Sequence, residues 1–403
     1  MSETAPTTLV LPYGSDMHVH LRQGELMNMV TPLVEQGGIA TAFVMPNLQP
    51  PLTNVKAVVE YHKQLQALAP EITFLMSLYL SPELTPDEIR KAAQAGITGV
   101  KSYPRGVTTN SDAGIESYTA YYPVFEAMQE VGMILNLHGE VPSDPDNGIC
   151  VLNAEAKFLG HLKELHTAFP KLRIVLEHAT TRDAVEMVKS LGPTVGCTIT
   201  VHHLQLIVDD WAGFHHNFCK PVAKYPHDRA ALRAVVKEGH PRFFLGSDSA
   251  PHPRHAKENV QSCAGVFTTP LVMPYLATIL ESFGALHRLR GFACDFGRRF
   301  YHLSDHPADP LPSDYPSITL RRLPRSLTDG GGEESKEGAA ASSAASPGMR
   351  ASDLPKDKAA KVPAEFIVPE AYPYGIPGAA AGGGEVVPFW SGRVLTWTIA
   401  ETQ

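Results

Sequence analysis

The chain has 403 residues, of which 43% are hydrophobic and 19% are charged, a composition typical of a soluble globular protein with one large domain or two small ones. Its 34 basic and 42 acidic residues give a net charge of −8, and the absence of a run rich in Lys and Arg argues against a nucleic-acid partner. No apolar run reaches the roughly 18 to 20 residues that span a bilayer, which argues against membrane insertion.

Short apolar, β-branched runs alternate with amphipathic stretches, the pattern of buried parallel strands joined by helices. The expected strands are TLVLP (8–12, running into Asp16), TAFVMP (41–46), TFLMSLYL (73–80), ITGVKSY (97–103), MILNLH (133–138), LRIVLEH (172–178), VGCTITV (195–201) and RFFLGSD (242–248). Helices are expected over 53–68, 85–96, 117–132 and 181–192, several with Thr or Ser at the start and Gly at the end. Eight such alternations within about 280 residues predict an α/β fold, a (β/α)8 barrel of TIM type.

The composition changes after residue 322. Residues 322–361 are rich in Gly, Ser, Ala and Pro and poor in aromatic and branched apolar residues, which predicts a disordered, low-complexity insertion. Ordered composition returns in 365–378 and 385–401, where short strands are expected to pack back on the barrel; a disordered tail is the alternative. We therefore expect a barrel over 1–321, the insertion over 322–361 and a C-terminal segment over 362–403.

Polar side chains stand at the carboxyl ends of several expected strands, where the active site of such a barrel is built. They are Asp16, His18 and His20 after the first strand, Lys101 in the fourth, and His138, His178 and Asp248 at the ends of the fifth, sixth and eighth. Alternation along a strand puts His18 and His20 on the same side, as two ligands of one ion require. A single buried histidine is more often structural, but four His, one Lys and one Asp on one face predict a site for two divalent cations of zinc type.

Lys101 needs a separate explanation, because a buried ammonium group without a partner is costly. Addition of carbon dioxide would convert it to a carbamate (N6-carboxylysine), whose two oxygens could bridge both ions. The role of Asp16 stays open between orienting its loop and supporting the ligands.

In order along the chain, the motifs resemble those of the class II dihydroorotases of the amidohydrolase superfamily, the single-function type of bacteria, fungi and plants, and specifically the fungal type. The resemblance covers nearly all of residues 8–322. It rests on DMHVHLR (16–22), MPN (45–47), KSYP (101–104), LHGE (137–140), LEHAT (176–180), CKPVAK (219–224), GSDSAPH (246–252) and the closing segment PEAYPYG to VVPFWSG. HxH alone occurs throughout the superfamily, whereas its combination with the other motifs is much narrower.

The resemblance implies a role for each matched residue. His18 and His20 would hold one zinc with Asp248, His138 and His178 would hold the second, and carbamylated Lys101 would bridge the two. Arg22, Asn47 and His252 would grip the substrate carboxylate, the backbone around Lys220 and Ala264 would contact the substrate ring, and Thr108 and Thr109 would belong to a lid loop. A guanidinium group suits a carboxylate because it offers two parallel donors.

The implied reaction is the reversible, zinc-dependent cyclisation of N-carbamoyl-L-aspartate to (S)-dihydroorotate in pyrimidine (UMP) synthesis, with metal-bound hydroxide as nucleophile and Asp248 as general acid and base. The expected partners are this small molecule and a second copy of the chain in a homodimer. One alternative is another cyclic-amide hydrolase, of hydantoinase or allantoinase type, which the carboxylate grip would distinguish. The other is an inactive scaffold homologue, which the presence of all six metal positions disfavours.

The cysteines and the remaining histidines are expected to be structural. The five cysteines are odd in number and widely spaced and contain no CxxC pair, which predicts buried thiols in a reducing compartment and hence a cytoplasmic protein: Cys150, Cys197, Cys219, Cys263 and Cys294. His202, His203, His215 and His216 are interpreted as structural or rim residues.

Overall fold

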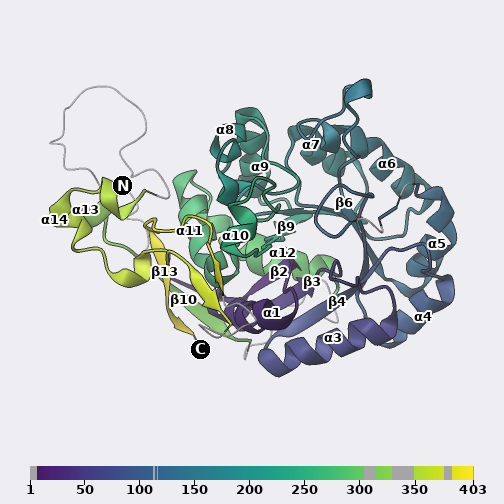
Figure 1. The fold of residues 1–403 in the computed structure, drawn as a ribbon, viewed down its shortest axis with the longest axis horizontal. Coiled ribbons are helices and arrows are strands. Elements are labelled where there is room, and N and C mark those ends of the chain that lie inside the picture. The colour runs from purple at the N-terminus through teal and green to yellow at the C-terminus, as the bar shows by residue number, and fades with distance from the viewer. Residues whose placement is uncertain are drawn as a thin grey trace.

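A ring of eight parallel strands forms the centre of the protein (Figure 1). The structure, a computed structural model, describes residues 7–111, 114–115, 117–303, 315–328, 349–375 and 384–402. Neighbouring strands follow one another in chain order: β2 (Gly14–Val19), β3 (Ile39–Val44), β4 (Thr73–Tyr79), β5 (Gly99–Ser102), β6 (Ile134–His138), β7 (Ile174–Glu177), β8 (Val195–Ile199) and β9 (Phe243–Leu245). The predicted (β/α)8 barrel of TIM type is confirmed.

The barrel closes where β9 meets β2. Val19 and Ser249 form a parallel bridge, and the amide of Asp248 donates to the carbonyl of His18 over 2.8 Å. The amide of His20 donates to the carbonyl of Ser249 over 3.1 Å. The two segments that close the ring are therefore those that carry His18, His20 and Asp248.

Helices connect the strands on the outside of the barrel, and Figure 1 shows α3 to α7 along one side of it. Their bounds are α1 (Gly24–Val30), α2 (Leu33–Gln36), α3 (Val55–Leu68), α4 (Pro86–Gln94), α5 (Tyr122–Val131), α6 (Ala154–Ala168), α7 (Arg182–Ser190), α8 (Val208–Trp211) and α9 (Pro226–Glu238). Three further helices follow β9: α10 (Arg254–Lys257), α11 (Val272–Ser282) and α12 (Phe296–Phe300). In the described ranges no helix combines the length and the apolar character that crossing a bilayer requires.

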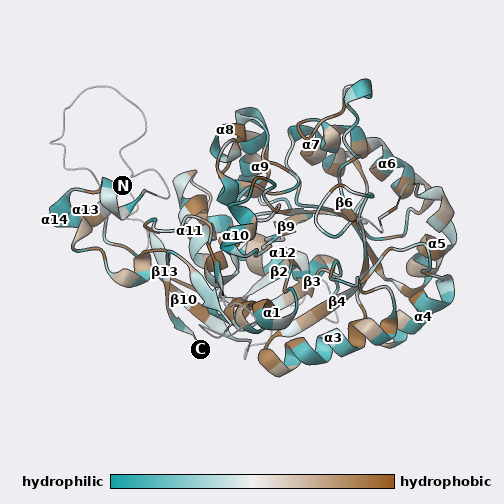
Figure 2. Ribbon diagram, in the orientation of Figure 1, coloured by the Kyte–Doolittle hydropathy of each residue, from teal (hydrophilic) through white to brown (hydrophobic). Residues whose placement is uncertain are grey.

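The helix sequences explain their placement. Along α3, polar and apolar residues alternate around the helix (Figure 2), and the buried ones, Val58, Tyr61 and Leu65, recur at helical spacing on one face. The side chains of Thr85 and Thr181 accept hydrogen bonds from the backbone three residues on, so each caps the helix that follows it. Helix starts were thus readable from the sequence.

The inside of the barrel changes from apolar to polar along its axis. An apolar cluster that includes Phe43, Val175 and Phe244 packs around Tyr301, which follows α12. Next to it, the amide of Asn136 donates to the hydroxyl of Tyr301 and to the carboxylate of Glu177. A polar layer therefore separates the apolar core from the carboxyl ends of the strands.

The prediction of the first barrel strand was wrong. TLVLP forms β1 (Thr8–Pro12), which pairs antiparallel with β10 (Ser317–Arg322) in a separate three-stranded sheet completed by β13 (Trp397–Thr402). The side chain of Val10 is 68% exposed, as in a strand with one face in solvent. The first barrel strand is β2, all of whose residues are buried. It contains the polar residues Asp16 and His18, so it does not form an apolar run in the sequence.

The C-terminal segment lies on the side of the barrel that carries β10, on the left in Figure 1. It contains β11 (Tyr372–Tyr374), β12 (Gly384–Val386) and β13, and Trp397 is completely buried. The expected short strands are therefore present in this segment.

Residues 329–348 of the expected insertion lie outside the described residues. Its flanks form α13 (Arg325–Thr328) and α14 (Lys356–Ala359), because Leu323, Leu354 and Val362 bury their side chains in a small cluster with Phe366 and Val394. The division at 321 and 361 stays a prediction, and we propose that the barrel and 362–403 unfold as one unit.

Replacing Trp397 by Ala tests this proposal. Removal of the buried indole should lower the free energy of unfolding by about 3–5 kcal/mol, measured by urea denaturation. Val10→Ala is the control in the same sheet and should change it by less than about 0.5 kcal/mol, because the side chain is exposed. A Trp397→Ala protein as stable as the unmodified chain would show that the C-terminal segment does not support the barrel.

Candidate active site

The predicted site residues come together at the carboxyl ends of the barrel strands. One cavity is lined by His18, His20, Arg22, Asn47, Thr108, Thr109, His138, His178, Lys220, Asp248 and Ala264. Lys101 lies beside it, with Nζ 5.3 Å from the ring centre of Tyr103, which also lines the cavity. Nε2 of His252 is 3.1 Å from a terminal nitrogen of Arg22. The fold thus joins residues that are up to 246 positions apart.

Three predicted ligands meet at one carboxylate oxygen. Oδ1 of Asp248 lies 3.3 Å from Nε2 of His18 and 3.0 Å from Nε2 of His20, and all three side chains are buried. The ring of His178 is 5.1 Å from that of His18 and 4.7 Å from that of His138, between their centres. Five of the six predicted ligands therefore form one continuous group.

Two atoms of the six predicted ligands lack hydrogen-bond partners within the described part of the chain. They are Nζ of Lys101 and Nδ1 of His178, both buried. Such atoms are costly unless an ion, a water or a further chemical group satisfies them. Imidazole, carboxylate and modified amine groups are suitable ligands of zinc, so the residues present fit two divalent cations.

The environment of Lys101 makes its amine easier to deprotonate. Burial lowers the pKa of Lys101 to about 8, even though the carboxylates of Glu177 and Asp248 act in the opposite direction. A larger fraction of the side chain is then neutral near pH 7 than in an exposed lysine. The neutral amine is the form that can add carbon dioxide.

Two buried glutamates that the sequence reasoning did not single out orient the imidazoles. Oε2 of Glu177 lies 2.8 Å from Nδ1 of His18, and Oε2 of Glu140 lies 2.9 Å from Nε2 of His138. Each carboxylate occupies one ring nitrogen and so directs the other toward the group of ligands. A charged residue inside an otherwise apolar strand, as in LRIVLEH, was the available signal.

Asp16 does not point at the ligands but holds the barrel closed. Its carboxylate accepts hydrogen bonds from the amide of Ser247 (2.7 Å), from the hydroxyl of Ser247 and from the amide of His18 (3.1 Å). Burial raises the pKa of Asp16 to about 6, against these hydrogen bonds. The contacts with Ser247 favour a residue that orients the loop carrying Asp248, and this role of Asp16 stays a prediction.

The backbone is strained at three predicted site residues. Arg22, His178 and Asp248 have φ values of 63°, 43° and 46°, in the left-handed region. Such conformations cost on the order of 1–3 kcal/mol and occur often at functional sites. The hydroxyl of Tyr61 donates to the carbonyl of Arg22 (2.6 Å) and so helps to hold one of them.

Gly246 makes room for the ligands. A Cβ atom there would lie 2.7 Å from the side chain of Thr198 and 2.9 Å from Cβ of His18. Both neighbours are packed in the barrel interior, so any larger residue would displace them. The close approach of β9 to β2 next to His18 therefore requires glycine.

Backbone carbonyl groups orient two of the residues that are predicted to bind the substrate carboxylate. Nε of Arg22 donates to the carbonyl of Pro251 over 3.0 Å, which orients the guanidinium group. Nε2 of His252 lies 3.0 Å from the carbonyl oxygen of Ala264. These contacts hold the two side chains against each other while Arg22 lines the cavity.

The loop that carries Thr108 and Thr109 lies against Asn47. The side-chain amide of Asn47 donates to the carbonyl of Thr109, and that of Asn110 donates to the carbonyl of Asn47, each over 3.0 Å. The loop therefore lies at the edge of the cavity, which Thr108 and Thr109 line. A loop in this place can act as a lid that excludes water.

Lys257 joins the two segments expected to contact a substrate ring. Its buried ammonium group donates to the carbonyls of Phe218 (2.8 Å), Cys263 (2.9 Å) and Gly265 (2.8 Å). These carbonyls flank Lys220 and Ala264, so one side chain sets the spacing of both segments. No motif in the sequence pointed to this role.

Comparisons with known proteins identify similar sequences and structures. The sequence model of the Amidohydrolase family matches residues 56–191. The chain is 50% identical to a protein of Mycosarcoma maydis named dihydroorotase, over 98% of this chain and 99% of that protein. The crystal structure of dihydroorotase from Saccharomyces cerevisiae in complex with 5-fluoroorotic acid has a TM-score of 0.81 and 40% identity, with 98% of both chains covered.

A more distant structure shows the fold alone. The L-hydantoinase (dihydropyrimidinase) of Arthrobacter aurescens has a TM-score of 0.67 at 22% identity, with 79% of both chains covered. Proteins named as dihydroorotase and as hydantoinase therefore share the barrel architecture. The architecture alone does not indicate which substrate is bound.

Glu177→Gln should weaken metal binding. The amide keeps the size of the side chain but loses the charge beside Nδ1 of His18, so zinc affinity should fall by about 10- to 100-fold in competition with a chelator. The control is Glu155→Gln, which removes a buried carboxylate that contacts Thr180 and Thr181 instead of a predicted ligand. Equal zinc affinities of Glu177→Gln and the unmodified chain would contradict the orienting role.

Proposed function

The chain belongs to the dihydroorotase family of metal-dependent amidohydrolases, and from this premise we propose that the cavity at the carboxyl end of its barrel interconverts dihydroorotate and N-carbamoyl-aspartate. The chain is a hydrolase that acts on a cyclic amide, and its activity serves pyrimidine synthesis. The observation that carries the proposal is the convergence of five of the six predicted ligands and Arg22 on one cavity.

Identity separates this function from the nearest alternative. The chain is 50% identical to a dihydroorotase over nearly its whole length, against 22% for the hydantoinase. The site adds a chemical reason, because dihydroorotate carries a carboxylate that a plain hydantoin ring lacks. Arg22 lines the cavity at the place where it could bind that group.

We propose the following distribution of metal ligands. His18, His20 and Asp248 would hold one zinc ion, His138 and His178 would hold the second, and Lys101 would bridge them as a carbamate. The buried Nζ of Lys101 has no hydrogen-bond partner among the described residues, which supports the carbamate, since the modification would add two ligating oxygens there. When bound, zinc ions lower the pKa of a coordinated water and polarise a carbonyl group.

Asp248 is proposed as the general acid and base. Hydrolysis adds water to the ring carbonyl and breaks the amide bond, so one proton must move from the water to the departing nitrogen. The Asp248 carboxylate lines the cavity and is fixed by two imidazoles, which favours transfer of that proton at a constant position. In the direction of synthesis the same carboxylate returns the proton.

The remaining predicted residues would position the substrate. Arg22, with Asn47 and His252, would bind its carboxylate, and the backbone at Lys220 and Ala264 would hold the ring. The loop with Thr108 and Thr109 would close after binding and keep solvent out. A homodimer and a cytoplasmic location stay predictions that rest on the family resemblance and on the cysteine pattern.

The direct test measures zinc content and dihydroorotate hydrolysis on the purified chain. We expect at least two zinc ions per chain, those of the binuclear centre, and measurable hydrolysis, followed by the loss of ring absorbance. Asp248→Asn should reduce kcat by at least about 10²-fold, because it removes both a ligand and the proton acceptor. An intact chain that binds no zinc and hydrolyses nothing would favour the scaffold alternative.

Arg22→Met tests the carboxylate grip. Removal of the guanidinium should lower kcat/KM for dihydroorotate by about 10²- to 10³-fold, which corresponds to about 3–4 kcal/mol. Arg182→Met is the matched control, because Arg182 is an exposed arginine on α7, and it should leave kcat/KM unchanged. An undiminished rate in Arg22→Met would place the carboxylate elsewhere.

A further inference from the structure

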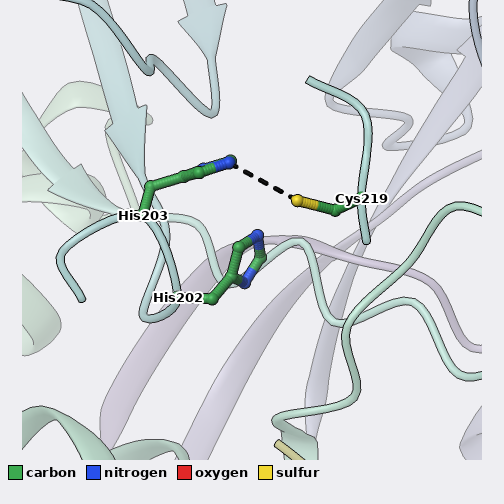
Figure 3. A group of neighbouring side chains, drawn as sticks. All are labelled: His202, His203 and Cys219. Atoms are coloured by element: carbon green, nitrogen blue, oxygen red, sulfur yellow. Dashed lines mark hydrogen bonds between the residues drawn. The ribbon is translucent and has the colours of Figure 1, made fainter. Parts of the chain in front are cut away.

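A second group of metal-ligating side chains lies outside the predicted ligand set. It consists of His202 and His203, in the turn after β8, and Cys219, at the start of CKPVAK (Figure 3). All three are at most 1% exposed, and one donor atom of each lies within 4.8 Å of the others. Figure 3 shows the three side chains directed toward a common space.

Two donor atoms are already spaced like ligands of one ion. Sγ of Cys219 lies 3.6 Å from Nε2 of His203. Tetrahedral zinc, with bonds of about 2.0–2.3 Å, places neighbouring donors roughly 3.3–3.6 Å apart. The carbonyl oxygen of Pro221 lies 3.0 Å from the same Nε2 and 3.2 Å from the same Sγ, so a fourth donor is at hand.

His202 supplies an independent indication of a ligand. Neither of its ring nitrogens has a hydrogen-bond partner among the residues that the structure describes, and its side chain is completely buried. The ring centre lies 4.4 Å from that of His203, with which it forms one side of the group. Buried imidazoles normally have a partner, so this one calls for an ion or a water.

We propose that His202, His203 and Cys219 bind one thiophilic divalent cation of zinc type, with the carbonyl of Pro221 as the fourth donor. Thiolate and imidazole together select zinc over the hard cations magnesium and calcium. The site contains none of the ligands assigned to the binuclear centre, so it goes beyond the proposed function and does not depend on it.

Binding would require a defined exchange of protons. In the free protein Nε2 of His203 and the thiol of Cys219 both donate to the carbonyl of Pro221, and the hydroxyl of Thr200 contacts Nδ1 of His203. On binding, the proton of His203 moves to Nδ1, where the Thr200 oxygen accepts it. The thiol releases its proton to solvent, so one proton leaves for each cation bound.

The cation would connect two segments of the cavity wall. His202 and His203 follow β8, whereas Cys219 precedes Lys220, which lines the candidate active site. A cross-link between them would fix the backbone at Lys220. The site therefore combines a structural ion with a position next to the expected substrate ring.

Cobalt substitution tests the proposal, because a cobalt–thiolate bond gives a charge-transfer band in the near ultraviolet that imidazole and carboxylate ligands do not. The full chain, stripped of metal and titrated with Co²⁺, should show this band and a third equivalent of bound metal. The band should disappear in Cys219→Ser. In His202→Asn the apparent affinity for Co²⁺, measured from the band, should fall at least 10-fold, which provides a second variant if the first does not fold.

Cys294→Ser is the matched control, since Cys294 is also buried and donates to a backbone carbonyl, that of Pro12. This variant should keep the band. A folded chain without the band at excess Co²⁺, or a band that survives in Cys219→Ser, would overturn the proposal. Loss of dihydroorotate hydrolysis with the band retained would instead count against the proposed function alone.

Discussion

Closure of the barrel between β2 and β9 is the constraint on which the candidate site depends. The strand β9 is short, and the described contacts there include a single bridge, two backbone hydrogen bonds, the carboxylate of Asp16 on Ser247 and the hydroxyl of Ser247 on the carbonyl of His18. The same two segments hold His18, His20 and Asp248. The pairing of β2 with β9 thus sets the relative position of these three residues. A change that weakens this pairing would move the ligands before it unfolded the barrel.

The polar layer inside the barrel makes a buried cationic side chain possible near the contact between β2 and β9. Lys101 lies near the carboxylates of Glu177 and Asp248, whose charges favour the ammonium form while burial opposes it. Glu177 in turn accepts hydrogen bonds from Asn136 and Thr198. Because each buried charge is balanced through a neighbour, the layer works as one network, and removal of one carboxylate would affect both His18 and Lys101.

Much of this arrangement could be predicted from the sequence, and the failures have a common cause. Strands with mostly apolar residues, such as β3 and β6, were visible as apolar runs, and the predicted ligand His138 stood at the end of β6. The strand β2 was missed because its inward face is polar. Glu177 and Lys257 were missed as well, because their roles depend on contacts with His18 and Phe218, which are distant in sequence.

The strained and unpartnered groups suggest how stability and function are divided in this fold. Positive φ values occur at His178 and Asp248, near the carboxyl ends of barrel strands. The nitrogen atoms of Lys101 and His202 that have no hydrogen-bond partner among the described residues lie in the same region. Each is a cost to the free protein that bound metal can offset, since a ligand at 1,000 times its Kd stabilises the folded state by about 4.1 kcal/mol. The apolar end of the barrel, which has no such features among the described residues of its core cluster, must then supply the stability that permits them.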